Sequence, residues 1–266
     1  MNQLVSLLTC AALASSFSCK EEEDSPDLPP AASMNVQLDA LNNAPLAAKN
    51  APSGPTAAPE DYVNFANAWA RVRIVQFFAG AVVVVPALSI GAALQQKPTK
   101  DGDLWKWNVT VGDARADLEV SASLLEGFDL DLYITNTELE RFLWVEGAFG
   151  DGSGGGSWTL HDPKIEGTNT EALSIQWSYV SDTDRSLSYE IVSPLPNAQG
   201  EVVTGDTFTL TIDGMRATLE YVDADDTSVT AVISWDTATG AGSIIVPDFN
   251  QGQKACWDAA FENTGC

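Results

Sequence analysis

The sequence predicts a mostly β fold: an antiparallel up-and-down meander of about nine or ten strands that closes as a barrel or folds as a sandwich, with one long apolar N-terminal helix packed on or in it. Apolar and polar residues alternate with a period of two over most of the stretch 104–249, which is strand periodicity. Turn residues interrupt this stretch at intervals too short for the helical crossovers that parallel strands need. A long apolar segment at 60–98 shows helical spacing instead.

The alternation is easiest to see at Leu118, Val120, Ala122 and Leu124, which are separated by acidic residues or serines. The same pattern returns along the chain at Trp105–Val111, Phe128–Ile134, Leu173–Tyr179, Phe208–Ile212 and Val229–Trp235. Clusters of turn-forming residues lie between these runs, among them Gly112–Asp113, Gly150–Gly156, Asn197–Gly200 and Asp213–Gly214. We therefore expect hairpins over residues 99–250, in a sheet that curls because flat sheets leave exposed edges.

The composition is that of a folded, strongly acidic protein. The chain has 266 residues, of which 45% are hydrophobic, so a sizeable core can form. It carries 37 acidic and 13 basic residues, which gives a formal net charge of -24. This charge repels nucleic acid and anionic membrane surfaces, so neither is an expected partner. The same acidity also serves solubility without any partner.

Residues 1–18 are expected to be a signal peptide. They contain no charged side chain and centre on the apolar run Leu4–Ala14, which has the length of a secretory h-region and is too short for a permanent membrane span. Cys19 follows at once, and Lys20 and four acidic residues come after it. Cys10 lies inside the h-region and is the weaker lipidation candidate, because cleavage there leaves an apolar mature terminus.

This arrangement resembles a bacterial lipoprotein signal, although Phe17 and Ser16 replace the small residue and the leucine that are usual at those places. The resemblance implies removal of residues 1–18 and attachment of a diacylglycerol group to Cys19. The run from Lys20 to Asp24 is similar to the export signal of Bacteroides-type surface lipoproteins, which implies a lipid anchor in the outer membrane and exposure at the cell surface. An ordinary signal peptide before an acidic mature chain is the alternative.

Two further segments precede the strands. Residues 19–59 are expected to be the acylated cysteine and a flexible tether, because Pro, Ala, Asn and Ser are abundant there. Residues 60–98 are expected to be one apolar helical segment with an acidic, proline-led start. The run Ile74–Leu94 is long enough for a transmembrane helix, but Pro86 should kink or end a helix, so a core helix enclosed by the strands is favoured.

The C-terminal tail, residues 251–266, carries Cys256 and Cys266. A close pair of cysteines in an exported protein is most simply a disulfide, which closes a small loop and stabilises the fold by roughly 2 to 3 kcal/mol. Zinc is the alternative, but two cysteines without a nearby histidine are too few ligands. With Cys10 removed and Cys19 acylated, every cysteine is accounted for.

The sequence predicts no catalytic residue, no cofactor and no metal site. His161 is the only histidine and no nucleophile turn accompanies it, so a hydrolase is the third choice and has no identifiable site. The loop 150–156 and the group Asp223, Asp225 and Asp226 offer oxygen ligands to calcium, but neither matches an EF-hand loop. Solvated hairpin tips are the simpler interpretation of both.

Aromatic residues on the apolar parity of their strands allow two interpretations. In the first, they are ordinary core residues packed around the apolar helix. In the second, they line a cavity for a lipid or another apolar ligand, as in lipocalin-like barrels. The residues of this second interpretation are Trp105, Trp107, Trp177, Tyr179 and Trp235.

These observations predict a non-enzymatic cell-envelope lipoprotein, anchored in the outer membrane through covalent lipid, that binds an apolar small molecule or a surface protein. The alternative is a structural or adhesive surface module with a filled core, in which the acidic loops carry recognition. The volume behind the tryptophans distinguishes the two, because a helix that fills the interior leaves no space for a ligand.

Overall fold

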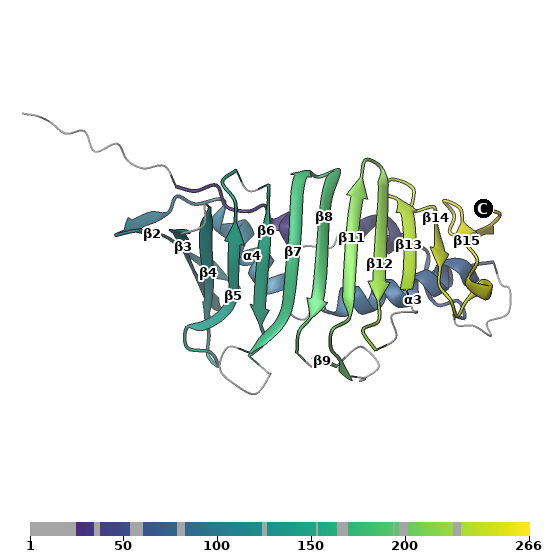
Figure 1. Cartoon of the computed structure of the whole chain (residues 1–266), viewed down its shortest axis with the longest axis horizontal. Coiled ribbons are helices and arrows are strands. Elements are labelled where there is room, and N and C mark those ends of the chain that lie inside the picture. Colours follow the sequence, from purple (N-terminus) through teal and green to yellow (C-terminus); the bar gives the residue numbers. More distant parts are fainter. Residues whose placement is uncertain are drawn as a thin grey trace, which may run out of the picture.

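The computed structural model describes residues 25–34, 38–53, 61–78, 83–123, 127–152, 154–163, 170–193, 195–196, 202–225 and 230–266. A single antiparallel sheet of fourteen strands dominates these residues (Figure 1). Each strand pairs with its neighbour in the chain, except that β8 pairs with β11 and the short β9 and β10 form a separate hairpin between them. The predicted antiparallel meander is therefore confirmed.

The strand bounds show where the prediction of nine or ten strands fell short. They are β1 Thr99–Asp101, β2 Leu104–Val111, β3 Ala114–Ala122, β4 Phe128–Thr135, β5 Phe142–Phe149, β6 Gly155–His161, β7 Glu171–Ser181, β8 Asp184–Ile191, β9 Leu195–Pro196, β10 Val202–Val203, β11 Thr207–Asp213, β12 Arg216–Val222, β13 Thr230–Asp236, β14 Gly242–Ile245, β15 Ala255–Trp257 and β16 Asn263–Thr264. The additional strands of the sheet lie at its two ends and have two to four residues each. Runs this short carry no readable alternation.

The register of the strands places the apolar side chains on one face of the sheet. One buried row crosses six strand pairs, each residue opposite the next: Trp107, Leu118, Leu132, Val145, Leu160, Leu173 and Ile191. The adjacent row points to the other face and is polar: Lys106, Glu119, Asp131, Glu146, Thr159, Ser174 and Glu190. We call these the inner face and the outer face.

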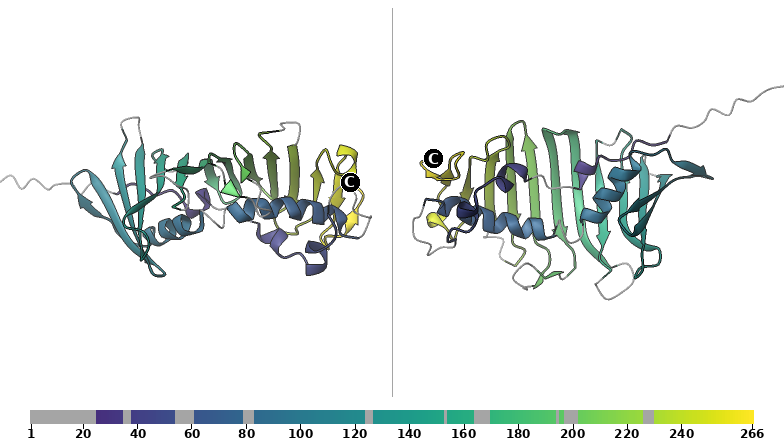
Figure 2. Two further views of the ribbon diagram at one scale, coloured as in Figure 1. Left: turned by 90° about the horizontal axis from the view of Figure 1, so that it is seen from below. Right: turned by 180° about the vertical axis from the view of Figure 1, so that it is seen from behind.

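The sheet stays open, so the predicted closure into a barrel is wrong, and the described residues contain no second large sheet that would make a sandwich. The end strands β1 and β16 lie far apart at opposite ends of the sheet (Figure 1). Helices and the N-terminal segment cover the inner face instead of a second wall of strands (Figure 2). An apolar face needs cover, and helices provide it as well as strands do.

Two helices lie against the inner face in place of the single long helix expected over 60–98. α3 (Val63–Phe78) packs on β14, β15 and β16, and α4 (Val84–Ala93) packs on β2 and β3. Residues 79–82 between them lie outside the described part of the chain. Pro86 falls in the first turn of α4, where a backbone N–H has no helical acceptor, so it is tolerated there. Within the described residues, no helix has the length and hydropathy needed to cross a membrane.

Much of the expected flexible tether is folded against the rest of the protein. Residues 25–34 and 38–53 form η1 (Ala31–Ser33), α1 (Asp39–Asn42) and α2 (Leu46–Lys49). η1 packs on β7 and α4, and α2 packs on α3. The segment folds because it supplies apolar side chains that are buried: Leu28, Met34, Leu38, Leu41, Ala44 and Ala48. The predicted signal peptide 1–18, Cys19, and residues 35–37 and 54–59 lie outside the described residues.

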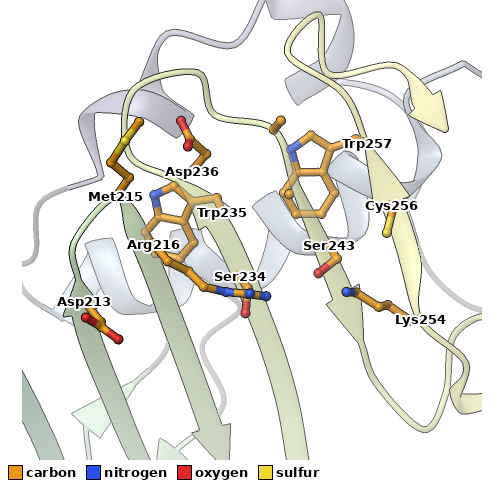
Figure 3. A pocket seen from close by; sticks show the side chains of 12 residues that line it. Asp213, Met215, Arg216, Ser234, Trp235, Asp236, Ser243, Lys254, Cys256 and Trp257 are labelled. Atoms are coloured by element: carbon orange, nitrogen blue, oxygen red, sulfur yellow. The ribbon is translucent and has the colours of Figure 1, made fainter. Parts of the chain in front are cut away.

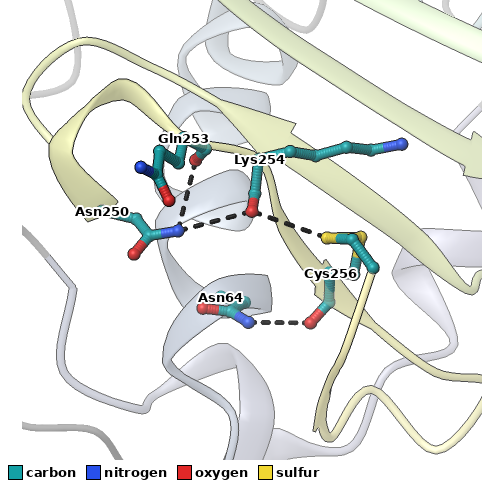
Figure 4. Close-up of a disulfide and its surroundings, with 6 residues drawn as sticks. Asn64, Asn250, Gln253, Lys254 and Cys256 are labelled. Atoms are coloured by element: carbon teal, nitrogen blue, oxygen red, sulfur yellow. Dashed lines mark hydrogen bonds between the residues drawn. A yellow bond between two sulfur atoms is a disulfide. The ribbon is translucent and has the colours of Figure 1, made fainter.

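The predicted disulfide between Cys256 and Cys266 is confirmed, with Cα atoms 5.3 Å apart (Figure 4). The tail around it begins with η3 (Asn250–Gly252) and adds β15 and β16 to the end of the sheet. Asn64 in α3 holds this end in place. Its side-chain amide donates to the carbonyl oxygen of Cys256 at 2.7 Å, and its backbone N–H donates to Oδ1 of Asn263 at 3.0 Å.

Candidate ligand-binding hollow

The structure does not bring the five predicted ligand-binding aromatics together. Trp105 and Trp107 lie on β2, Trp177 and Tyr179 on β7, and Trp235 on β13. Five strand steps separate β2 from β7, and four separate β7 from β13. At ~4.8 Å per step these groups are about 20 to 24 Å apart, too far to line one small-molecule cavity.

Four of these five aromatics have partners of their own, and the fifth, Trp235, is buried at 2% exposure. The indole of Trp107 donates to the carbonyl oxygen of Gln96 at 3.3 Å. Trp177 stacks on Trp158 with ring centroids 6.1 Å apart. Trp105 lies under the ammonium of Lys100 and against the edge of Phe128, and Tyr179 donates its hydroxyl to Asp182 at 2.9 Å. The structure therefore favours the interpretation of these residues as packing residues.

The other residues singled out from the sequence form no reactive group. His161 is buried, and its Nε2 lies 3.0 Å from a carboxylate oxygen of Glu146 on the neighbouring strand β5. No group of three His, Cys, Asp or Glu residues suited to a metal ion occurs in the described ranges. Of the two calcium candidates, Asp226 and Ser153 lie outside those ranges, so neither set is described as a whole.

The feature best suited to a ligand is a hollow of about 530 Å³ on the outer face at the C-terminal end of the sheet (Figure 3). It lies over β12, β13, β14 and β15. Its centre is lined by small side chains, since Ser234 on β13 and Ser243 on β14 face each other in register and Gly242 precedes Ser243. Longer side chains rise around them: Asp213, Met215, Arg216, Asp236 and Lys254. The hollow exists because small residues on central strands are bordered by long ones.

Two cations of the hollow have no partner in the described part of the chain. The side chains of Arg216 and Lys254 form neither a hydrogen bond nor an ion pair there, and both are exposed. In Figure 3 both side chains reach into the space beside Ser234 and Ser243. A guanidinium and an ammonium together offer a fork of donors and a point charge, a combination that suits carboxylate, sulfate or phosphate groups.

The two serines add hydroxyl groups at the floor of the hollow. Ser234 is 9% exposed and shares a hydrogen bond of 3.1 Å with Thr218 on β12. Ser243 is 7% exposed and lines the same hollow. Hydroxyls of this kind both donate and accept, so they can bind the oxygens of an anion or the hydroxyls of a larger polar ligand.

Two carboxylates also border the hollow, and one of them is engaged elsewhere. Asp236 accepts hydrogen bonds from the backbone N–H groups of Ala238 and Thr239 and from the Thr239 hydroxyl, all at Oδ1. These bonds hold the pKa of Asp236 below its ordinary value and keep its carboxylate turned toward the β13–β14 connection. Asp213 lies opposite Arg216 in the β11–β12 register and limits how much negative charge the hollow can accept.

The floor is fixed from behind by two tryptophans. Trp235 and Trp257 project to the inner face and are 2% and 1% exposed. The indole of Trp257 donates to the carbonyl oxygen of Gly240 at 2.7 Å, and its ring stacks edge to face with Phe65 of α3. A rigid floor lowers the entropic cost of holding Arg216 and Lys254 in place for a ligand.

The sequence analysis did not single out Arg216 and Lys254. They are separated by the whole of β13 and β14, and they meet only because β12 to β15 pair in that order. One feature of the sequence could have indicated them. Basic residues are scarce in this chain, 13 against 37 acidic ones, and Arg216 and Lys254 are the two that occur after residue 200. In comparisons with known proteins, no family model, no curated protein and no solved structure matches the chain.

Proposed function

We propose that this protein is a non-enzymatic cell-envelope lipoprotein, anchored in the outer membrane through acylated Cys19, which binds ligands on the outside of its sheet. The observation that supports this function is the filled inner face. α3, α4 and the N-terminal segment occupy the side on which an enclosed apolar cavity would have to lie. The alternative of a surface module with a filled core thus has better support than a barrel-type lipid carrier.

The ligand class follows from the chemistry of the hollow. Two cations that have no ion-pair partner among the described residues, together with two serine hydroxyls, favour a ligand with a carboxylate, sulfate or phosphate group. Apolar cargo would make no use of these charged and hydroxyl groups. The volume of about 530 Å³ corresponds to a compound of sugar or dipeptide size or to one unit of an acidic polymer.

The proposed location in the outer membrane is tested on the protein purified from its own membranes. Intact-mass measurement should show a chain that begins at Cys19 and carries the added mass of a diacylglycerol-based anchor. A mature chain without acyl groups would exclude the lipoprotein assignment, and an ordinary signal peptide would then be the better explanation of residues 1–18.

Binding is tested on the same full-length protein by titration with inorganic phosphate, sulfate and glucuronate. Isothermal calorimetry measures affinity, and tryptophan fluorescence reports on Trp235 and Trp257 beneath the hollow. We expect Arg216→Ala and Lys254→Ala each to weaken binding by roughly tenfold or more, because each removes a charged donor. Arg73→Ala is the matched control, since Arg73 is an exposed cation on α3 that forms no ion pair with any residue the structure describes. Equal effects of all three substitutions would refute the hollow as the binding site.

A further inference from the structure

The helix α4 exposes an apolar stripe to solvent. Val84, Leu88 and Leu94 are 47%, 55% and 43% exposed, and Ala87 and Gly91 lie between them at helical spacing. The opposite side of the helix is buried, with Ile90 and Ala93 at 1% and 0% exposure against β2 and β3. α4 contains no charged residue. One side of the helix thus belongs to the core, and none of the described residues covers the other.

The segment of the chain that contains this stripe has the opposite charge to the rest of the sequence. Residues 62–100 contain no aspartate or glutamate, but four basic residues: Arg71, Arg73, Lys97 and Lys100. The remainder of the chain carries all 37 acidic residues. Lys97 and Lys100 follow directly after α4 and are exposed. An apolar stripe flanked by lysines matches the boundary between lipid tails and phosphate headgroups.

The position of the described N-terminus brings this end of the molecule close to the proposed lipid anchor. Five residues, 20–24, connect Cys19 to Ser25, where the described chain begins. Five residues span at most about 18 Å. Residues 25–34 run to η1, which packs on α4, and both lie at the β2–β7 end of the sheet (Figure 2). The sheet of fourteen strands is about 60 Å wide, so this end alone can stay near an anchor on so short a connection.

We propose that the stripe of Val84, Leu88 and Leu94 on α4 is a bilayer contact, which inserts at the headgroup boundary while Lys97 and Lys100 meet lipid phosphates. This inference rests on the proposed acylation of Cys19. A diacylglycerol anchor attaches the chain to the bilayer but leaves the domain free to turn, and an apolar and basic surface on α4 would add a second point of contact. The contact also sets the orientation of the sheet, with the hollow at β12–β15 at the end far from the membrane.

The test uses full-length acylated protein reconstituted into vesicles of phosphatidylethanolamine and phosphatidylglycerol. Leu88→Cys carries an environment-sensitive fluorophore, and Met215→Cys is the matched control, because Met215 is an apolar side chain with 62% exposure between β11 and β12, many strands away from the β2 and β3 on which α4 packs. Both positions are exposed, so the fold tolerates the label. We expect blue-shifted emission and quenching by spin-labelled lipid at Leu88→Cys, and neither at Met215→Cys.

Three other outcomes would overturn the inference in different ways. If the mass spectrum of the sample shows acylation but the Leu88→Cys label is quenched by aqueous iodide as strongly as the Met215→Cys label, the bilayer contact is wrong and the proposed function stands. If Cys19 is unacylated, the proposed function fails as well. If the Leu88→Cys label is shielded in detergent without vesicles and light scattering reports a dimer, a second copy covers α4.

Discussion

Tyr189 on β8 donates its hydroxyl to the backbone carbonyl oxygen of Met34 at 2.6 Å, across 155 positions of the chain. Both residues are buried, with Met34 at 0% exposure. Burial raises the pKa of Tyr189 well above its ordinary value, so the hydroxyl stays protonated and remains a donor. This bond joins the N-terminal segment to the middle of the inner face.

Replacing Tyr189 by Phe should therefore destabilise the fold. The substitution leaves the Met34 carbonyl buried without a donor, which costs about 1 to 3 kcal/mol. Tyr179→Phe is the matched control, because the Tyr179 hydroxyl binds exposed Asp182, and its loss should change stability by less than about 0.5 kcal/mol. Urea unfolding of the three proteins measures the difference. Similar losses of unfolding free energy for both variants would show that the bond between Tyr189 and Met34 does not stabilise the fold.

The disulfide offers a second test, at the C-terminal end of the sheet. We expect the double variant Cys256→Ala, Cys266→Ala to lose about 2 to 3 kcal/mol, because the closed loop no longer restricts the unfolded chain. Thermal unfolding of the parent protein with and without reductant should reproduce that loss. If the reductant also lowers the stability of the double variant, the reductant does not act through this disulfide, and the loss seen in the parent protein cannot be assigned to it.

The alternation of apolar and polar residues predicted the strands of this fold but not what covers their apolar face. Alternation along Leu118, Val120 and Ala122 determines which side chains share a face, and the register confirms that assignment. The same alternation is compatible with any cover for the apolar face, so it could not distinguish a second wall of strands from helices. The burial of Leu28 and Met34 was equally hidden, because scattered apolar residues in a Pro- and Ala-rich segment have no period.

The candidate site was less predictable than the fold. Its cations are brought together only by the pairing of β12 to β15, and its depth comes from the small side chains of Ser234 and Ser243. Small residues in strands leave no positive signal in a sequence. The tryptophans suggested a ligand site instead, because large aromatic side chains occur both in binding pockets and in ordinary cores.

Gly242 on β14 tests how closely the inner face is packed behind the hollow, because it lies opposite Trp235 and Trp257 in register. A Cβ at this position would lie 2.4 Å from the carbonyl oxygen of Ser234 and 2.4 Å from the Trp257 ring. Gly242→Ala should therefore destabilise the protein by about 1 to 3 kcal/mol, as overpacking does in a close-packed region. Gly150→Ala is the matched control, since nothing lies within 4 Å of its Cβ. Equal midpoints of urea unfolding for the two variants would show that β14 shifts freely.

Asp131 on β4 should show a pH-dependent effect on stability. It lies between Glu119 and Glu146 in register on the outer face. Burial, and then these and other carboxylates, raise the pKa of Asp131 above its ordinary value, although the Tyr133 hydroxyl opposes the rise. The folded state therefore holds its proton more tightly than the unfolded chain does, and stability falls as pH rises through the folded-state pKa. Ionised Asp131 thus weakens the fold at neutral pH.

Asp131→Asn should accordingly stabilise the protein at neutral pH, because it removes a charge between like charges and keeps an acceptor for Tyr133. The gain should disappear below about pH 3.9, the pKa of an unfolded aspartate, where the parent side chain is protonated in both states. Asp129→Asn on the same strand is the control and should show a smaller gain, since Asp129 is exposed. Thermal unfolding across this pH range measures the gain, and a gain that persists in acid would assign the effect to packing instead of charge.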